Sequence, residues 1–274
     1  MEPLHALILG IVEGLTEFVP VSSTGHLILA GAWLGLDATP GQKAAVDAFD
    51  IVIQAGAWLA CVIYYFSYLR QRTADLFAKD AAERARGWRI VINLGVAFIP
   101  VVLVGLPLRS LIKSVLFGPG PVAVALAVGG VVMIGADRLR HRTQQVDGLD
   151  GITIKQALVV GLFQCFSLIP GTSRSMSTMI GGMGAGLSAR IAADFSFLLA
   201  VPVLGAATGY ELFKEWDTLT AHIGPGAMAV GLAASFVVGW ASIAAFLRLL
   251  TARGLAPFGV YRVLLAGLVW WQLL

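Results

Sequence analysis

Long apolar stretches separated by short polar segments fill almost the whole chain. Two of the apolar stretches, at 4–18 and 154–169, are short, and each is followed closely by a proline. The others are long enough, as helices, to cross the roughly 30 Å hydrocarbon core of a bilayer. These predicted spans lie at 49–69, 90–106, 120–136, 193–212, 226–247 and 256–273.

Each of the two shorter stretches is broken and then continues as a second half-length helix. Pro20 ends the first helix because it disfavours helical geometry at the residue before it, and 22–36 can form the next helix. Pro170 and Gly171 interrupt the second stretch before a helix over 174–187. Non-helical backbone at membrane depth is tolerated where it is buried in protein or lines a wet cavity. We therefore expect two re-entrant helical hairpins.

The second half of the chain restarts the pattern of the first half after a shift of 151 residues. With this shift, the segment ALILGIVE at 6–13 lies over ALVVGLFQ at 157–164, and Ser22 lies over Ser173. These matches coincide with the two breaks and their hydroxyl clusters. The sequence therefore predicts an internal repeat.

The repeat also predicts the architecture of the protein. Each copy, about 1–137 and 152–274, holds one hairpin and three spans, which is an odd number of crossings. The second copy must then enter the membrane from the opposite side, as in inverted-topology repeats whose broken helices meet near the midplane. We expect one all-α integral membrane domain over 1–274, with six full spans and two re-entrant hairpins.

Composition agrees with this architecture. Of the 274 residues, 58% are hydrophobic and 13% are charged, against about 25% charged in a soluble domain. The mean hydropathy is +0.83. The formal net charge of +3 is small and says little about partners. The basic residues lie mainly between apolar stretches, so they report topology, and we expect the bilayer and no nucleic acid as a partner. Cys61 and Cys165 lie within apolar stretches and read as packing residues.

Basic residues predict how the chain is oriented in the membrane. They are concentrated in the connections 70–89, 137–155 and 248–255, whereas the other connections hold few. By the positive-inside rule, these three connections face the cytoplasm. Both termini then lie outside, and the first hairpin enters from the outside.

Two carboxylates lie in the first hairpin. Glu13 and Glu17 are four residues apart and share one helical face. An ionised carboxylate at membrane depth needs a partner, a metal or a wet cavity. Two like charges this close do not both ionise cheaply, so either one is protonated and shuttles a proton, or a cation neutralises both.

Three hydroxyl residues and a histidine follow the first break. One of Ser22, Ser23 and Thr24 is expected to cap the new helix. A serine becomes a nucleophile when a base removes its proton and a third group orients that base, and Ser23, His26 and Glu17 supply these types. Alternatively, His26 itself attacks phosphorus while a carboxylate fixes its tautomer.

The second break has the composition of an anion site. Gly171 allows a tight turn, Thr172 or Ser173 can cap the next helix, and that helix presents free N–H groups and its positive dipole end. Arg174 adds a planar cation that fits phosphate oxygens. The alternative is that Arg174 serves only as an ion-pair partner of a carboxylate in the first hairpin. Further hydroxyl donors are Ser175, Ser177 and Thr178.

Together the two breaks favour phosphoryl transfer on a substrate with an apolar tail. Such reactions depend mostly on holding and neutralising the phosphates. A transporter or flippase is the alternative, because inverted repeats with broken helices at the midplane are also transporter architecture. A carrier needs charge complementarity but no nucleophile.

The residues at the two breaks carry a resemblance to a known family. EGLTEFVPVSSTGH at 13–26 and PGTSRSMST at 170–178 are similar to the two signature motifs, (E/Q)xxxE and PGxSRSxxT, of the undecaprenyl-diphosphate phosphatase family, also called bacitracin-resistance proteins. The likeness covers nearly the whole chain, including FSFLLAVP at 195–202 and the pair Tyr261-Arg262.

The resemblance implies a bacterial inner-membrane enzyme with its site open to the periplasm and both termini periplasmic. It would remove one phosphate from the C55 isoprenoid diphosphate, recycling the carrier lipid for peptidoglycan and other cell-wall polymers and giving bacitracin resistance. A divalent cation, Mg²⁺ or Ca²⁺, and a homodimer are also implied.

Carried onto this sequence, the resemblance gives three sets of site residues. The catalytic set is Glu17, Ser23, His26 and Arg174. The metal ligands are Glu13 and Glu17. The substrate-binding set is Ser22, Thr24, Gly171, Thr172, Ser173, Ser175 and Thr178. Whether serine or histidine attacks is left open by the motifs.

Overall fold

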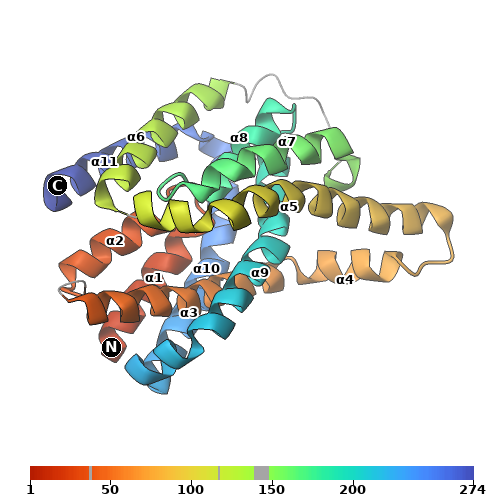
Figure 1. The fold of residues 1–274 in the computed structure, drawn as a ribbon. Helices are drawn as coiled ribbons and strands as arrows, with labels where there is room; N and C mark the ends of the chain where they lie inside the picture. The colour runs from red at the N-terminus through yellow and green to blue at the C-terminus, as the bar shows by residue number, and fades with distance from the viewer. Residues whose placement is uncertain (37–38, 117, 139–147) are drawn as a thin grey trace.

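The computed structural model describes residues 1–36, 39–116, 118–138 and 148–274, and these ranges are built of helices and loops without a strand. The first half contains α1 (Pro3–Thr16), α2 (Ser23–Trp33), α3 (Pro40–Tyr64), α4 (Phe66–Asp75), α5 (Ala81–Val115) and α6 (Pro119–Ala136). The second half contains η2 (Leu149–Gly151), α7 (Ile154–Gln164), η3 (Cys165–Leu168), α8 (Arg174–Gly184), α9 (Ala189–His222), α10 (Pro225–Arg253) and α11 (Ala256–Leu273). Figure 1 shows α6 beside α11, and α4 beside the start of α5 where both extend beyond the other helices.

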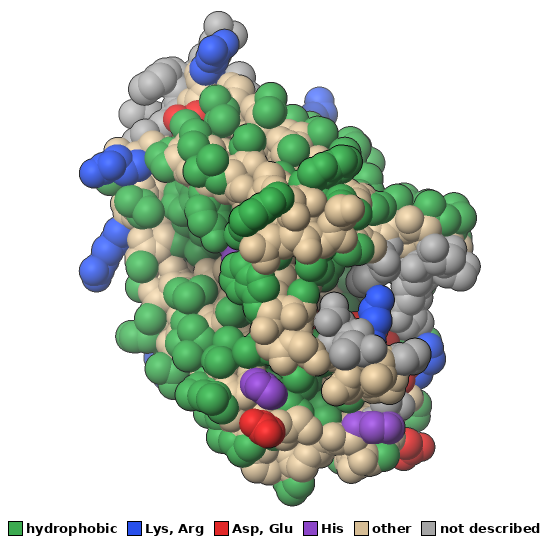
Figure 2. Space-filling model, turned by 90° about the vertical axis from the view of Figure 1, so that its left-hand side faces the viewer, with side chains coloured by type: hydrophobic (Ala, Val, Ile, Leu, Met, Phe, Trp, Pro, Cys, Tyr) green, Lys and Arg blue, Asp and Glu red, His purple; other side chains and the backbone are tan. Residues whose placement is uncertain are grey.

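The outer surface is that of a membrane protein. Figure 2 shows a face covered largely by hydrophobic side chains, with Lys and Arg toward its edges. Leu103, Leu106 and Leu264 are each more than two-thirds exposed, which suits contact with lipid tails. Among the described residues, five segments are long and apolar enough to span a bilayer: Gly41–Tyr64, Ala81–Leu108, Pro119–Ala136, Ala189–Asp217 and Pro225–Arg253. The predicted all-α integral membrane class is confirmed.

The sixth predicted span, 256–273, is the helix α11 and falls outside this group of five. Arg262 and Gln272 lower its hydropathy. Its crossing of the membrane stays a prediction.

The expected loop at 37–48 is helical over most of its length. Thr39 caps α3 by accepting a hydrogen bond from the Gln42 N–H at 3.2 Å, and Pro40 occupies the first position, where its missing N–H costs nothing. Residues 37–38 lie outside the described residues, as do 139–147 of the expected connection at 137–155.

The span predicted at 90–106 is the middle of a longer helix. α5 has 35 residues and contains both Pro100 and Pro107. Much of the expected connection at 70–89 is also helical, because α4 ends and α5 begins within it. The hydropathy pattern marked the lipid-facing part of α5 but not its ends.

Close helix pairs are made at glycines. α1 packs on α10, and α7 packs on α5. A Cβ on Gly14 of α1 would lie 2.7 Å from the carbonyl oxygen of Ser235, and a Cβ on Gly161 of α7 would lie 2.6 Å from that of Ala97. Small residues therefore let the first half of each broken helix approach its neighbour at backbone distance.

The two halves of the chain follow the same element order except for α4. Ser22 and Ser173, which match under the shift of 151 residues, have φ of 71° and 75° and are the only non-glycine residues with positive φ in the described ranges. α3 packs on α9, and α6 packs on α11. The opposite insertion of the two copies stays a prediction.

Candidate active site

The first hairpin breaks between Thr16, the last residue of α1, and Ser23, the first of α2. Ser22 occupies the N-cap position, but its side chain makes no capping hydrogen bond, and Thr24 already lies inside the first turn. The expectation that one of these three hydroxyls caps α2 is therefore wrong. The hydroxyl groups of Ser22, Ser23 and Thr24 are therefore free of a capping role in α2.

Glu17 joins residues from both breaks. The Ser23 Oγ donates a hydrogen bond to Glu17 Oε2 at 2.8 Å, and Arg174 Nη2 donates to Glu17 Oε1 at 3.1 Å. The side chains of Glu17 and Arg174 are only 8% and 9% exposed. Removing either partner of such a buried ion pair strongly destabilises a protein, because the remaining charge is left buried and unpaired. Three of the four predicted catalytic residues therefore meet.

Arg174 is held by more than its carboxylate. Its Nη1 donates to the carbonyl oxygen of Ser196 on α9 at 3.0 Å, and its guanidinium carbon lies 5.7 Å from the centre of the Phe18 ring. Its Nε is buried and has no hydrogen-bond partner among the described residues. A buried charged donor without a partner is a group that an anionic ligand could satisfy. Ser196 was missed by the sequence reasoning, because a backbone carbonyl leaves no signal in side-chain patterns.

The second break builds a helix N-terminus beside this pair. Gly171 has φ of 91°, which suits glycine, and the Ser173 side chain caps α8 by accepting from the Met176 N–H at 3.4 Å. The Ser175 hydroxyl lies 3.0 Å from that of Ser173. The predicted cap is confirmed, and Arg174 is the first residue of α8, at the positive end of the helix dipole.

Ser22 and Ser173, the two residues with positive φ, each place the backbone carbonyl oxygen within hydrogen-bonding distance of a side chain in the helix that follows. The Ser22 carbonyl oxygen lies 2.8 Å from Nδ1 of His26, and the Ser173 carbonyl oxygen accepts from the Ser177 Oγ at 3.0 Å. In each case the partner is four residues further on. A left-handed conformation costs energy for a residue with a Cβ, and such strain is concentrated at functional sites.

His26 has a partner that the sequence reasoning missed. Its Nε2 lies 2.7 Å from the Tyr261 hydroxyl on α11, and the two rings are stacked with an interplanar angle of 9°. The hydroxyl of Ser23 is bonded to Glu17 and not to His26. The Ser23 hydroxyl is therefore paired with a carboxylate, whereas the His26 imidazole is hydrogen-bonded to the Ser22 carbonyl oxygen and the Tyr261 hydroxyl.

Arg262 ties the two breaks together. Its side chain is fully buried, Nη1 donates to the carbonyl oxygen of Pro20 at 3.2 Å, and Nη2 donates to that of Gly171 at 2.9 Å. It also donates to the carbonyl oxygens of Ala125 and Leu126 on α6. An arginine within an apolar helix is expensive at membrane depth, and this signal alone could have marked Arg262 as functional.

Thr178 is engaged inside the protein. Its hydroxyl lies 2.6 Å from that of Ser196 and donates to the Arg174 carbonyl oxygen at 2.8 Å. It is completely buried. The contacts fix α8 against α9 behind Arg174, and substrate binding by Thr178 stays a prediction.

Glu13 supplies a buried carboxylate oxygen that no described residue contacts by a hydrogen bond. Its side chain is 2% exposed, and Oε2 has no hydrogen-bond partner among the described residues. The same ranges contain no group of three His, Cys, Asp or Glu side chains that could hold a metal alone. Mg²⁺ is commonly bound by one or two carboxylates together with substrate phosphates, so this site fits a cation that binds with its substrate.

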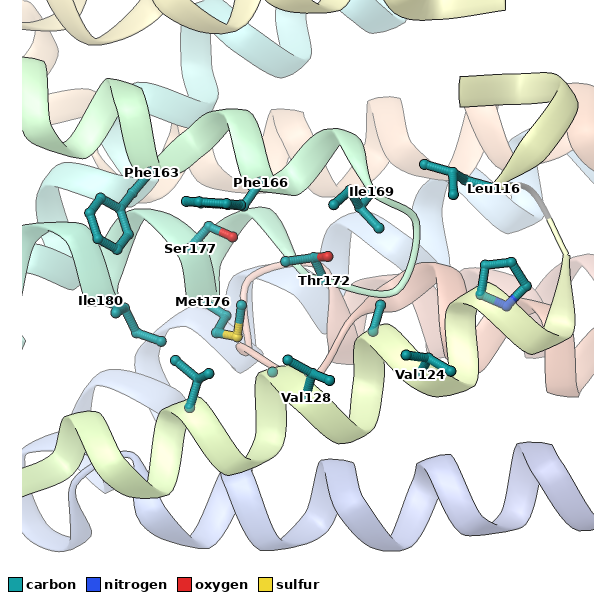
Figure 3. Close-up of a pocket in the computed structure, with 14 residues that line it drawn as sticks. Leu116, Val124, Val128, Phe163, Phe166, Ile169, Thr172, Met176, Ser177 and Ile180 are labelled. Carbon is teal, nitrogen blue, oxygen red and sulfur yellow. The ribbon is translucent and has the colours of Figure 1, made fainter. Parts of the chain in front are cut away.

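An apolar groove of about 720 Å³ lies between α6 and the second hairpin (Figure 3). Val128 of α6 faces Met176 and Phe166 across it, and the only side-chain hydroxyls among its lining residues belong to Thr172 and Ser177. Gly171 packs beside it against α6, where a Cβ would lie 2.7 Å from the Val122 carbonyl oxygen. A hydrocarbon surface therefore adjoins the second motif.

Fold and site together define an all-helical integral membrane protein in which two helix breaks meet at a buried ion pair of Glu17 and Arg174. The chain belongs to the bacitracin resistance family: the family profile described as "Bacitracin resistance protein BacA" matches residues 6–268.

Named relatives are similar along nearly their whole length. An undecaprenyl-diphosphatase of Sorangium cellulosum is 50% identical over 97% of this chain and 85% of that protein. An undecaprenyl-diphosphatase 1 of Chromobacterium violaceum is 44% identical over 98% of this chain and 96% of that protein. A Burkholderia thailandensis protein, also named undecaprenyl-diphosphatase 1, is 46% identical over 94% of this chain and 91% of its own.

Proposed function

We propose that this chain is an integral membrane phosphatase that hydrolyses undecaprenyl diphosphate to the monophosphate and inorganic phosphate. The observation that carries the proposal is the contact of Ser23 and Arg174 with the two oxygens of Glu17. It places a hydroxyl, a base and a phosphate-binding cation at one buried point. The product is the carrier lipid for peptidoglycan and other cell-wall polymers, and its recycling accounts for the bacitracin resistance of the family.

In the proposed reaction the Ser23 Oγ attacks the terminal phosphorus while Glu17 takes its proton. The bond from phosphorus to the bridging oxygen breaks, and the lipid monophosphate leaves. Water then hydrolyses the phosphoserine, which releases inorganic phosphate and restores Ser23. Arg174 and the N–H groups at the start of α8 hold the phosphate oxygens, and this charge stabilisation supplies most of the catalysis. Attack by His26 is the alternative.

A divalent cation, Mg²⁺ or Ca²⁺, belongs to the same proposal. The free Oε2 of Glu13 supports it, and Glu17 is the second expected ligand. The cation would neutralise charge on the phosphate oxygens. Chelation should lower turnover and added Mg²⁺ should restore it, whereas Glu13→Gln should raise the Mg²⁺ concentration needed for half-maximal rate.

The setting of the site is also proposed. The excess of basic residues in three connections supports periplasmic termini in the bacterial inner membrane and a site open to the periplasm. The matched backbone of Ser22 and Ser173 supports the inverted repeat. The groove beside Thr172 offers a surface for the isoprenoid chain. A homodimer stays an expectation from the resemblance.

Phosphate release from C55 diphosphate by purified protein in detergent tests the function. Ser23→Ala should abolish turnover but keep diphosphate binding, because Arg174 is untouched. Arg174→Ala should lose both. Ser67→Ala and Arg86→Ala, at exposed positions outside the site, are the matched controls and should behave as wild type. A folded wild-type protein that releases no phosphate with Mg²⁺ present would exclude the enzyme and favour a flippase.

Trapping the phosphoenzyme separates the two nucleophiles. Rapid quenching with a denaturing detergent at mildly alkaline pH, after mixing with labelled diphosphate, preserves both a phosphoserine and a phosphohistidine. The label should survive a later acid treatment and map to Ser23, whereas a label on His26 that is lost in acid would reverse the assignment.

A further inference from the structure

Both ring nitrogens of His26 are engaged by groups of known hydrogen-bonding type. Nδ1 lies 2.8 Å from the Ser22 carbonyl oxygen, and Nε2 lies 2.7 Å from the hydroxyl of Tyr261. From this arrangement, we propose that Tyr261 is a positioning residue that holds the orientation of the His26 ring by donating to Nε2, in the tautomer that the Ser22 carbonyl oxygen sets. The inference deepens the proposed function and rests on it only where activity is measured.

The tautomer follows from which atoms can donate. A carbonyl oxygen only accepts, so Nδ1 must carry a proton. In the neutral ring Nε2 is then a bare acceptor, and the Tyr261 hydroxyl must donate to it. The Ser22 carbonyl oxygen therefore sets the neutral form of the imidazole, and the distant Tyr261 donates to the bare nitrogen of that form.

Tyr261 is itself held in place. It precedes Arg262, whose guanidinium is bonded to the carbonyl oxygens of both hairpin loops. On the same helix, a Cβ on Gly259 would lie 2.6 Å from the Gly130 carbonyl oxygen, so α11 is seated directly on α6. The hydroxyl of Tyr261 thus reaches His26 from an element that is fixed to both breaks.

The consequence concerns the nitrogen that is available to a substrate. Nδ1 is committed to Ser22, so His26 can address a phosphate only through Nε2. The Tyr261 hydroxyl donates to that nitrogen, and a bare Nε2 cannot donate to a phosphate oxygen. His26 can therefore act on the substrate only by taking a proton or by attacking phosphorus at Nε2, after the Tyr261 hydrogen bond gives way. His26 thereby acts on the substrate, while Tyr261 acts through His26.

Nitrogen NMR of histidine-labelled protein in detergent tests the geometry without substrate. The His26 signals are identified by their loss in His26→Ala. Wild-type protein should show the neutral Nδ1–H form. Tyr261→Phe, which keeps the stacked ring, should keep this form because the Ser22 carbonyl oxygen is untouched, but its Nε2 signal should shift, because that nitrogen loses the hydrogen bond that it accepts. Tyr64→Phe is the matched control and should match wild type, because its ring contacts Tyr65 and its hydroxyl makes no hydrogen bond within the described part of the chain. An Nε2–H form, or an unchanged spectrum in Tyr261→Phe, would overturn the inference.

Kinetics with C55 diphosphate then test the role. Losing one hydrogen bond should lower kcat of Tyr261→Phe by about three- to tenfold with little change in KM. In the His26→Ala background the same change should have no further effect, because the residue it acts through is gone. An equal loss in both backgrounds would show a structural role only. Wild-type protein without phosphatase activity would refute the proposed function, while the NMR result would still decide the positioning role.

Discussion

Glu17 receives hydrogen bonds from two residues that are far apart in the sequence. Ser23 belongs to the same hairpin, whereas Arg174 comes from the second half of the chain. Because the side chains of Glu17 and Arg174 are buried, their interaction is stronger than it would be at a surface, and leaving either charge unpaired is more costly. The contacts of this one carboxylate therefore serve both the proposed catalysis and the joining of the two hairpins.

Arg262 gives a prediction at this scale. Arg262→Lys should lower the thermal midpoint and the phosphatase activity together, because one ammonium group does not satisfy the carbonyl oxygens of Pro20 and Gly171 as the guanidinium does. Leaving buried acceptors unpaired costs on the order of 3 kcal/mol. Thermal unfolding in detergent measures the effect. Arg86→Lys, at a half-exposed position, is the control, and equal midpoints for the two variants would contradict the role assigned to Arg262.

Much of the site could be predicted from local sequence, and the reason is chemical. Glu17, Ser23 and Arg174 are types that are seldom placed at membrane depth for packing alone. Tyr261 and the Ser196 carbonyl could not be assigned, since an aromatic residue at a helix face and a backbone oxygen look ordinary until the neighbouring helix is known.

At the scale of the helices, the important features are where each helix begins and ends. The two breaks place Ser22 and Ser173 in the same left-handed conformation, so each new helix starts at a fixed angle to the one before it. Prolines predicted where these helices stop. The length of α5, and the start of α3 at Pro40, could not be read from hydropathy, because polar residues beyond the lipid core extend helices as well as apolar ones do.

The contact of α1 with α10 gives a prediction at this scale. Gly14→Ala should destabilise the protein by about 1–3 kcal/mol, because the added methyl group would meet backbone atoms of Ser235 and Gly239 at 2.7 and 2.8 Å. Gly95→Ala in α5 is the matched control: no atom lies within 4 Å of its new Cβ, so its midpoint should not fall. Thermal unfolding of the two proteins in detergent compares them, and a neutral Gly14→Ala would show that α1 and α10 can separate freely.

At the scale of the whole molecule, packing between the two halves of the chain brings the two hairpins into contact. α1 packs on α10, α7 packs on α5, and the pairs α3–α9 and α6–α11 also join the two halves. This exchange of partners means that neither half completes its own site. Opposite insertion of the two copies in the membrane would explain how both loops reach the same depth.

Cysteine labelling tests the proposed orientation. In a protein with Cys61 and Cys165 replaced by Ala, an impermeant maleimide added to intact cells should label Lys43→Cys, because that position lies on the proposed periplasmic side. Arg84→Cys should react only after permeabilisation. Both side chains are exposed, so access depends on the membrane alone. The reverse pattern would invert the proposed topology.

The sequence by itself determined the class of protein, the two broken helices and the main reactive groups. These follow from local causes: hydropathy selects the membrane, proline stops helices, and charged or hydroxyl groups in apolar stretches demand partners. Only the tertiary structure decided which groups meet. It paired Ser23 with Glu17, gave His26 to Tyr261, and used Arg262 to join the loops of Pro20 and Gly171. Such choices depend on how helices from distant parts of the chain pack, and a one-dimensional pattern does not record that.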